Sequence, residues 1–284
     1  MRQAPLLRAV TTTISVAPLT ALLAAALAAC VCLPAGATAT PAVSLHAAFH
    51  PERPGHTTTV ELEMRIDPGG AGAGEIVPPP LTEVSLSYPA GLDIALSGLG
   101  IDTCSVATLE AAGPSACPAD SWMGEGEAMA ELPIHHEPFR EDARIAILRG
   151  PEVENHLVML FYVYGETAVS ATLILTGRLL EANRPFGGRL AIAAPLVQSL
   201  PEGPDLTVGE LSFVLGPAEL TYYERVHDKV VPYTPNGIRL PEHCPRGGYP
   251  FAIELGFLGG AHAAASTAVA CPKRARAPEV SSRP

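Results

Sequence analysis

The chain has 284 residues, with 18 lysines and arginines against 29 aspartates and glutamates, which gives a formal net charge of −11 at pH 7. The bases concentrate at the two ends, so residues 40–272 hold 12 basic and 28 acidic side chains, a formal net charge of −16. Affinity for nucleic acid depends mainly on lysine and arginine contacts to phosphates, so this composition excludes nucleic acid as an expected partner.

The N-terminal segment has the three parts of a secretory signal. Arg2 and Arg8 precede an apolar stretch that ends near Leu33, and small residues follow up to Ala39. This order of charged, apolar and small residues is typical of a signal peptide. We expect residues 1–39 to be removed by cleavage after Ala39, which makes the mature protein secreted and extracytoplasmic.

A second processing motif competes within the same segment. Residues 27–30 read LAAC, which resembles a lipoprotein box in which Cys30 becomes the lipidated first residue. Cleavage there would leave Cys32 as a fifth, unpaired thiol, and it would keep an apolar stretch where a polar tether is expected. Cleavage after Ala39 avoids both problems and is the preferred interpretation. An envelope lipoprotein anchored at Cys30 is the alternative, and only then is a membrane a partner; retention of the whole segment as a transmembrane anchor is a third option.

The body of the chain has the two-residue periodicity of β-strands. Apolar and polar side chains alternate strictly over residues 60–67, which predicts a strand with one buried and one solvated face. Further strand candidates, each bounded by Gly, Pro, Asp or Asn, lie at 43–49, 83–89, 143–149, 156–164, 169–180, 188–195, 207–215 and 250–257. Gly and Pro are abundant (26 and 29 residues), so long helices are not expected, and 107–113 is the candidate for a short one.

These strands predict an all-β fold, a two-layer antiparallel β-sandwich preceded by the signal peptide. We expect residues 40–272 to form a single domain; two small sandwiches split near residues 149–155 are the alternative. The tail at 273–284 is basic and has no apolar pattern, so we expect it to be disordered.

Four cysteines remain after removal of the signal peptide, an even number that predicts disulfides in an oxidising compartment. Cys104 and Cys117 flank a short loop, and Cys244 and Cys271 flank the two arms of a predicted hairpin. We therefore expect the pairings 104–117 and 244–271. A zinc site is disfavoured because the spacings contain no close pair of cysteine ligands.

Three features together resemble a known group of proteins. Residues 86–94 read LSYPAGLDI, residues 117–128 read CPADSWMGEGEA, and Cys-Pro pairs recur at positions 244 and 271. They resemble a set of exported, uncharacterised β-rich proteins of actinobacteria and their relatives, which carry a C-P-x-x-S-x-x-G-x-G segment. The resemblance spans most of residues 80–272, and it implies an extracellular β fold without an assigned activity.

The segment at 117–128 is predicted to be a turn that leaves a disulfide and enters a strand. Asp120 or Ser121 is expected to hydrogen-bond back to the main chain. Gly124 and Gly126 are expected to adopt backbone conformations closed to other residues. Trp122, the only tryptophan, is expected to pack in the core.

Two clusters of polar side chains are candidates for chemistry. His135, His136 and Glu137 are weak candidates for a metal site, because neighbouring side chains on a strand point to opposite faces and the motif lacks the H-E-x-x-H spacing. Tyr222, Glu224 and His227 are residue types that perform acid–base catalysis. Alternation along a solvated loop or strand explains both clusters without a function, and that is the preferred interpretation.

No G-x-S-x-G elbow, phosphate-binding glycine loop or EF-hand loop occurs in the sequence. We assign no catalytic or cofactor-binding residue and expect no cofactor. The leading hypothesis is a structural or binding module of the bacterial cell envelope or exterior, with an unknown ligand and an unknown oligomeric state. A secreted hydrolase or metal-dependent enzyme is the alternative.

Overall fold

Antiparallel strands account for most of the chain in the computed structural model, which confirms the all-β expectation. The structure describes residues 40–69, 76–92, 98–134, 137–165, 171–198, 203–217, 219–235 and 237–272, all of which belong to one compact unit. The expected signal peptide, with Cys30 and Ala39, and the basic tail at 273–284 lie outside these residues.

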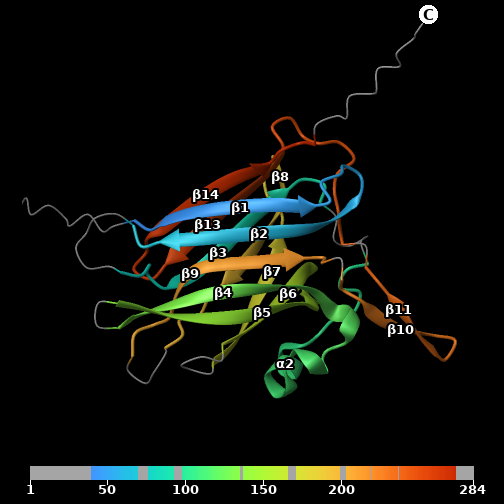
Figure 1. Ribbon diagram of the computed structural model, residues 1–284, viewed down its shortest axis with the longest axis horizontal. Helices are drawn as coiled ribbons and strands as arrows, with labels where there is room; N and C mark the ends of the chain where they lie inside the picture. The colour runs from blue at the N-terminus through green and yellow to red at the C-terminus, as the bar shows by residue number, and fades with distance from the viewer. Residues whose placement is uncertain are drawn as a thin grey trace, which may run out of the picture. The chain divides into compact units, whose positions relative to one another are not determined.

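A 12-stranded sheet contains nearly all of the strands (Figure 1). Its hydrogen-bonded order is β1 (Ala42–His50), β2 (Thr57–Asp67), β9 (Thr207–Leu215), β4 (Trp122–Ile134), β5 (Glu137–Val153), β6 (His156–Gly165), β7 (Ala171–Leu180), β8 (Phe186–Ala193), β3 (Leu81–Pro89), β13 (Tyr249–Phe257) and β14 (His262–Val269). The short strand β12 (Ile238–Arg239) pairs with β2.

The sheet curls into a nearly closed barrel. Strands β1 and β14 are the two ends of the hydrogen-bonded order, yet they lie side by side (Figure 1). This differs from the expected pair of separate layers, because one continuous sheet supplies both walls. Strand twist curves the sheet, and bulges in β4, β3 and β13 bend it further. Alternating sequence patterns are the same in a sandwich and in a barrel, so they could not separate the two.

Apolar side chains fill two separate cores. The alternating residues of β2 point into the barrel as predicted, and Val60, Leu62 and Met64 are all buried there. The second core lies on the outer face of β5 and β6, where Leu148 and Leu160 pack beneath the short helix α2 (Val106–Ala112). Burial on both faces explains why β5 and β6 read as continuous apolar runs rather than as strict alternation.

A two-stranded hairpin forms a separate small sheet (Figure 1). It consists of β10 (Tyr222–Val226) and β11 (Lys229–Tyr233). Tyr222 attaches the hairpin to the barrel, since its buried hydroxyl donates to the carbonyl of Trp122 and accepts the N–H of Gly100 at 2.9 Å. Tyr223, next along the strand, is 65% exposed.

The region considered as a domain boundary is a hairpin turn. Glu154 and Asn155 have positive φ values of 51° and 66°, the left-handed geometry of a tight two-residue turn between β5 and β6. The strands before and after this turn pair with each other, from Ala143↔Gly165 to Val153↔His156. A division at residues 149–155 would therefore cut through a hydrogen-bonded hairpin.

Candidate functional site

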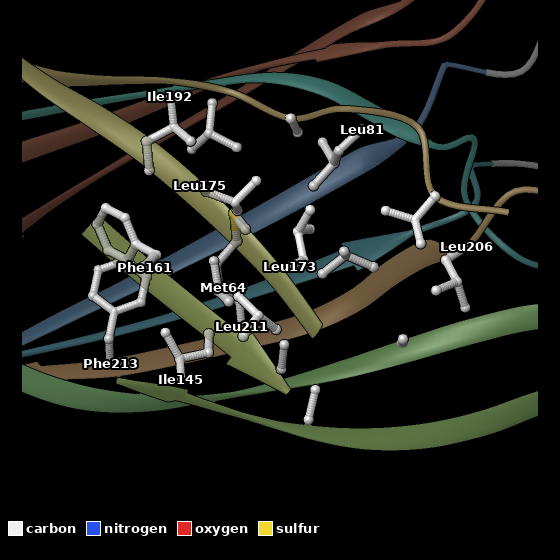
Figure 2. Close-up of a pocket in the computed structure, with 18 of the residues that line it drawn as sticks. Met64, Leu81, Ile145, Phe161, Leu173, Leu175, Ile192, Leu206, Leu211 and Phe213 are labelled. Carbon is white, nitrogen blue, oxygen red and sulfur yellow. The ribbon is translucent and has the colours of Figure 1, made fainter. Parts of the chain in front are cut away.

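An apolar cavity of about 210 Å³ lies inside the barrel. Figure 2 shows side chains from strands far apart in the sequence that point into it, among them Met64, Leu81, Ile145, Phe161, Leu173, Leu175, Ile192, Leu206, Leu211 and Phe213. An engineered cavity of about 150 Å³ with a similar aliphatic and aromatic lining binds benzene. The space in this barrel is therefore large enough for a small organic molecule.

Small residues on the inner face of β4 create the space. Residues that pair across neighbouring strands lie on the same face of the sheet. Gly126 pairs with Ile145 and with Phe213, which both point into the barrel, so Gly126 also faces inward. Ala128 and Ala130 face inward as well, because side chains two residues apart on a strand share a face. Both alanines line the cavity. An inward row that carries nothing larger than a methyl group leaves one end of the barrel hollow.

The opposite end of the barrel is filled by large side chains. Phe49 of β1 packs edge-on against Tyr249, with ring centroids 5.3 Å apart, and contacts Phe251 at 5.8 Å. Ile147 and Met159 continue the inner rows of β5 and β6 into this packed end and are buried. The contrast between the two ends shows that the cavity follows from side-chain size along each inner row.

Glu141 is the buried charged side chain that lines the cavity within the described residues. It is 6% exposed, and its Oε1 has no hydrogen-bond partner among the described residues. The carboxylate lies over Gly165 of β6, where a Cβ atom would come within 2.6 Å of Oε1. A glycine at position 165 therefore provides the room that the Glu141 carboxyl occupies.

Burial raises the pKa of the Glu141 carboxyl above its ordinary value of 4.5, because loss of water penalises the charged form. An unpartnered acceptor in an apolar space is energetically costly, by about 1–3 kcal/mol. Glu141 is thus a buried polar group of the cavity whose Oε1 is open to a hydrogen bond from a bound molecule, as far as the described residues show.

Polar side chains are a minority in the described lining of the cavity. Besides Glu141, the described polar lining consists of the exposed side chains of Glu63, Thr172 and Gln198 and the hydroxyl of Thr207, which donates to the carbonyl of Glu131 at 3.0 Å. Of the two carboxyl groups in the described lining, that of Glu141 is buried and that of Glu63 is exposed.

The expected metal candidates fall partly outside the described residues. His135 and His136 lie outside them, between β4 and β5, and Glu137 is an exposed residue at the start of β5. Across the ranges that the structure describes, no group of three or more metal-ligating side chains comes together.

Tyr222 and His227, expected to be near each other in the alternative enzyme, lie at opposite ends of the β10–β11 hairpin. Tyr222 pairs with Tyr233 at the barrel end, whereas His227 and Asp228 form the turn at the far end, about 17 Å away at 3.4 Å per residue. Burial raises the pKa of Tyr222 to about 12, so its phenol stays protonated at neutral pH. The Glu224 side chain is not among the described ones. Tyr222 and His227 are too far apart to form an acid–base pair.

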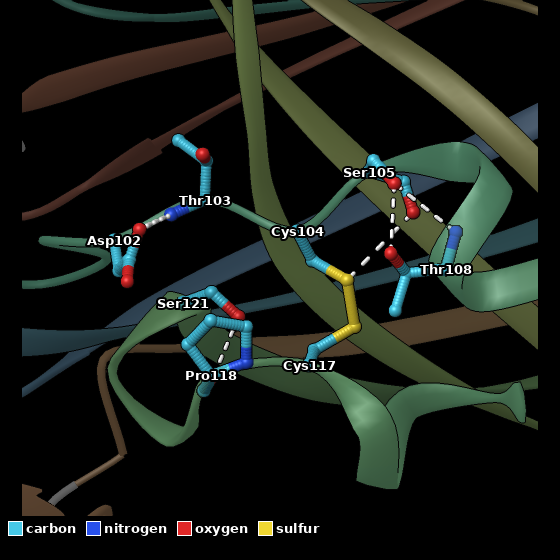
Figure 3. Close-up of a disulfide and its surroundings, with 8 residues drawn as sticks. All are labelled: Asp102, Thr103, Cys104, Ser105, Thr108, Cys117, Pro118 and Ser121. Atoms are coloured by element: carbon cyan, nitrogen blue, oxygen red, sulfur yellow. Dashed lines mark hydrogen bonds between the residues drawn. A yellow bond between two sulfur atoms is a disulfide. The ribbon is translucent and has the colours of Figure 1, made fainter.

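The disulfides join Cys104 to Cys117 and Cys244 to Cys271, the pairings expected from the sequence. Figure 3 shows the first of them between α2 and the turns η1 (Pro114–Ala116) and η2 (Ala119–Ser121). Ser105 caps α2 by accepting the N–H of Thr108 at 3.0 Å. Ser121 donates from its hydroxyl to the carbonyl of Pro118 at 2.7 Å, which is the back-bonded turn expected for this segment.

The two glycines of this segment serve a different purpose from the expected one. Neither Gly124 nor Gly126 is among the described residues with positive φ. They allow β9 to approach instead, since a Cβ at Gly124 would meet the Val214 carbonyl oxygen and one at Gly126 would meet that of Ser212, both under 3.0 Å. Trp122 is half-buried against the second core rather than inside the barrel.

Comparisons of the chain with protein-family models, with curated proteins and with solved structures give no match. None of the helices in the described ranges has the length and apolar character needed to cross a membrane. The cavity and the chemistry of its lining are therefore the features of this chain that bear on its function.

Sequence reasoning missed Glu141, although a signal for it was present. Residues 141, 143, 145 and 147 alternate along β5, and the last three are Ala, Ile and Ile. This period places Glu141 in the same row as buried apolar residues. A carboxylate in an apolar row, opposite small residues on β4, is the pattern that marks the site.

Proposed function

We propose that this chain is an exported, disulfide-bonded binding module of the bacterial cell envelope or exterior, and that it holds a small apolar molecule inside its barrel. The cavity of about 210 Å³ is the observation that carries the proposal. Ligand sites are typically concave, mostly apolar and supplied with a few polar groups, which is the composition of this lining.

Three further observations support the extracytoplasmic part of the proposal. Both disulfides fit an oxidising compartment. The sequence begins with the pattern of a signal peptide, and residues 80–272 resemble exported β-rich proteins of actinobacteria. Release after Ala39 is proposed here, with a lipid anchor at Cys30 as the alternative.

Toluene, an apolar probe without a polar group, tests binding in the cavity. We expect saturating toluene to raise the melting temperature of the wild-type protein, because a ligand that binds only the folded state stabilises it. Each kcal/mol of stabilisation should add about 2–4 °C for a domain of this size. Calorimetric titration should give one site per chain.

A filled cavity provides the matching variant. Ala143 faces Ala128 and Gly165 across the inner wall, so Ala143→Phe places a ring in the hollow end. We expect this variant to fold and to lose toluene binding, with Ala143→Leu as a milder version if the ring prevents folding. Ala193→Phe, on an exposed position of β8, should bind toluene normally. If the wild type, the folded Ala143 variant and Ala193→Phe all bind toluene equally well, the cavity is not the binding site.

A further inference from the structure

Glu141 gives the cavity a chemical preference as well as a shape. Its carboxyl group is buried at the cavity wall, and Oε1 accepts no hydrogen bond from the described residues. The flanking inward positions on the neighbouring strands, Ala130 and Gly165, carry no polar side-chain atom. No donor from the described residues reaches Oε1, and a molecule bound in the cavity can supply one.

The space suggests the size of the bound molecule. By simple proportion to the engineered cavity that holds benzene, about 210 Å³ accommodates about eight carbon atoms. Most of the remaining lining is aliphatic or aromatic, from residues such as Leu173, Leu175 and Phe161, so most of the molecule must be hydrocarbon (Figure 2).

The polar end of that molecule is constrained by charge. A carboxylate or phosphate next to Glu141 would place two acidic groups in an apolar space, which is strongly unfavourable. The formal net charge of −11 also disfavours the approach of anions. An amine or a hydroxyl group instead donates a hydrogen bond to the carboxyl group, and such bonds to a charged acceptor are among the stronger ones in proteins.

We propose that the natural ligand is a short aliphatic molecule whose polar end donates a hydrogen bond to Glu141, an amine or an alcohol and not a fatty acid. This inference rests on the proposed function, because it names the ligand class for the same cavity. It assigns Glu141 as the residue that determines specificity and leaves the apolar walls to supply affinity.

Four probes of equal chain length test the preference by calorimetric titration: octan-1-amine, octan-1-ol, octan-2-one and octanoate. The first two donate a hydrogen bond, the ketone only accepts, and octanoate is an anion. We expect the amine and the alcohol to bind the wild-type chain at least about tenfold more tightly than the ketone and octanoate, given the strength of a hydrogen bond to a charged group.

Two variants separate the role of Glu141 from general attraction to an acidic protein. Glu141→Met removes the acceptor and keeps a side chain of similar length, so we expect it to bind toluene but to lose the preference for the amine and the alcohol. Asp142→Asn changes the next residue of β5, whose side chain is exposed, and should keep the wild-type order of affinities. An amine preference that survives Glu141→Met would come from elsewhere and would overturn the proposal.

The outcomes distinguish this inference from the proposed function. If toluene and all four probes fail to bind, the cavity is not a binding site and both proposals fall. If toluene binds but the donors have no advantage, the binding function stands and the ligand class is wrong. If octan-2-one binds most tightly and this preference disappears in Glu141→Met, then Glu141 donates a hydrogen bond to the ligand instead of accepting one. That result would also overturn the inference.

Discussion

At the scale of single residues, Glu141 and Tyr222 show how burial decides what a polar group can do. The Tyr222 hydroxyl is buried with two main-chain partners, Trp122 and Gly100, so it fastens a hairpin to the barrel. Glu141 is buried beside Gly165, and its Oε1 has no partner within the described part of the chain. The first group has its hydrogen-bond partners in the fold, whereas the second lacks one among these residues, and this difference makes Glu141 the candidate site residue.

The raised pKa of Glu141 makes stability depend on pH. Between its ordinary value of 4.5 and its higher folded value, the folded state binds more protons than the unfolded state, so the free energy of unfolding falls as pH rises through this window. Glu141→Met should abolish this contribution. We expect the variant to be more stable than the wild type at pH 7, by about 1–3 kcal/mol, and the gap to narrow toward pH 4.

Urea unfolding of the ligand-free proteins between pH 4 and pH 7 measures this difference. Asp142→Asn is the control, and it should retain the wild-type decline because it leaves Glu141 in place. A gap that stays constant with pH would contradict the assignment of a raised pKa to the Glu141 carboxyl group.

At the scale of elements, the inner face of β4 and the first disulfide have complementary effects. The β4 row of Gly126, Ala128 and Ala130 opens the barrel at one end. The disulfide Cys104–Cys117 closes the second core on the outer face, where both cysteines are buried with Leu109. The hollow barrel is thereby supported from outside by a small, covalently closed layer.

Removal of each disulfide in turn tests whether the buried disulfide contributes more stability than the exposed one. Chain entropy alone predicts losses of roughly 3 kcal/mol for the pair 104–117 and roughly 3.5 kcal/mol for 244–271, since their sequence separations are 13 and 27. Cys104 and Cys117 are buried, whereas Cys271 is exposed. We therefore expect the opposite order when the free energy of unfolding is measured in denaturant. The double variant Cys104→Ala/Cys117→Ala should lose more stability than Cys244→Ala/Cys271→Ala. A smaller loss for the first double variant would mean that the second core contributes little.

At the scale of the whole molecule, the barrel, the two disulfides and the N-terminal sequence pattern all fit the proposed role of a binding protein outside the cytoplasm. A sheet whose ends lie side by side encloses a cavity, and the disulfides hold the layer outside it and the hairpin that ends the sheet. A protein that carries a small molecule outside the cytoplasm needs an enclosed space and resistance to unfolding. The proposed function draws on both properties.

The mass of the mature protein tests export and processing together. We expect the chain purified from the medium or periplasm of an expressing bacterium to begin at Thr40. Its mass should rise by about 4 Da on reduction after unfolding, because each of two disulfides takes up two hydrogen atoms. A diacylglycerol adduct on Cys30 would establish the lipoprotein alternative instead.

The sequence by itself determined the local structure. Strict alternation in β2, turn residues between the strands and an even set of cysteines predicted the all-β class, most of the strand positions and the pairings 104–117 and 244–271. These features depend on side-chain period and on short loops, which are properties of neighbouring residues.

Only the tertiary structure decided how the sheet closes and what it encloses. A strand with one buried face has the same pattern in a sandwich and in a barrel, because closure depends on twist and bulges summed over many strands. The cavity arises where Ala128 of β4, Ala143 of β5 and Gly165 of β6 fall side by side, and this register joins residues up to 37 positions apart. The tertiary structure also made Glu141 a candidate ligand-binding residue, because the fold buries its carboxyl group without a hydrogen-bond partner for Oε1 among the described residues.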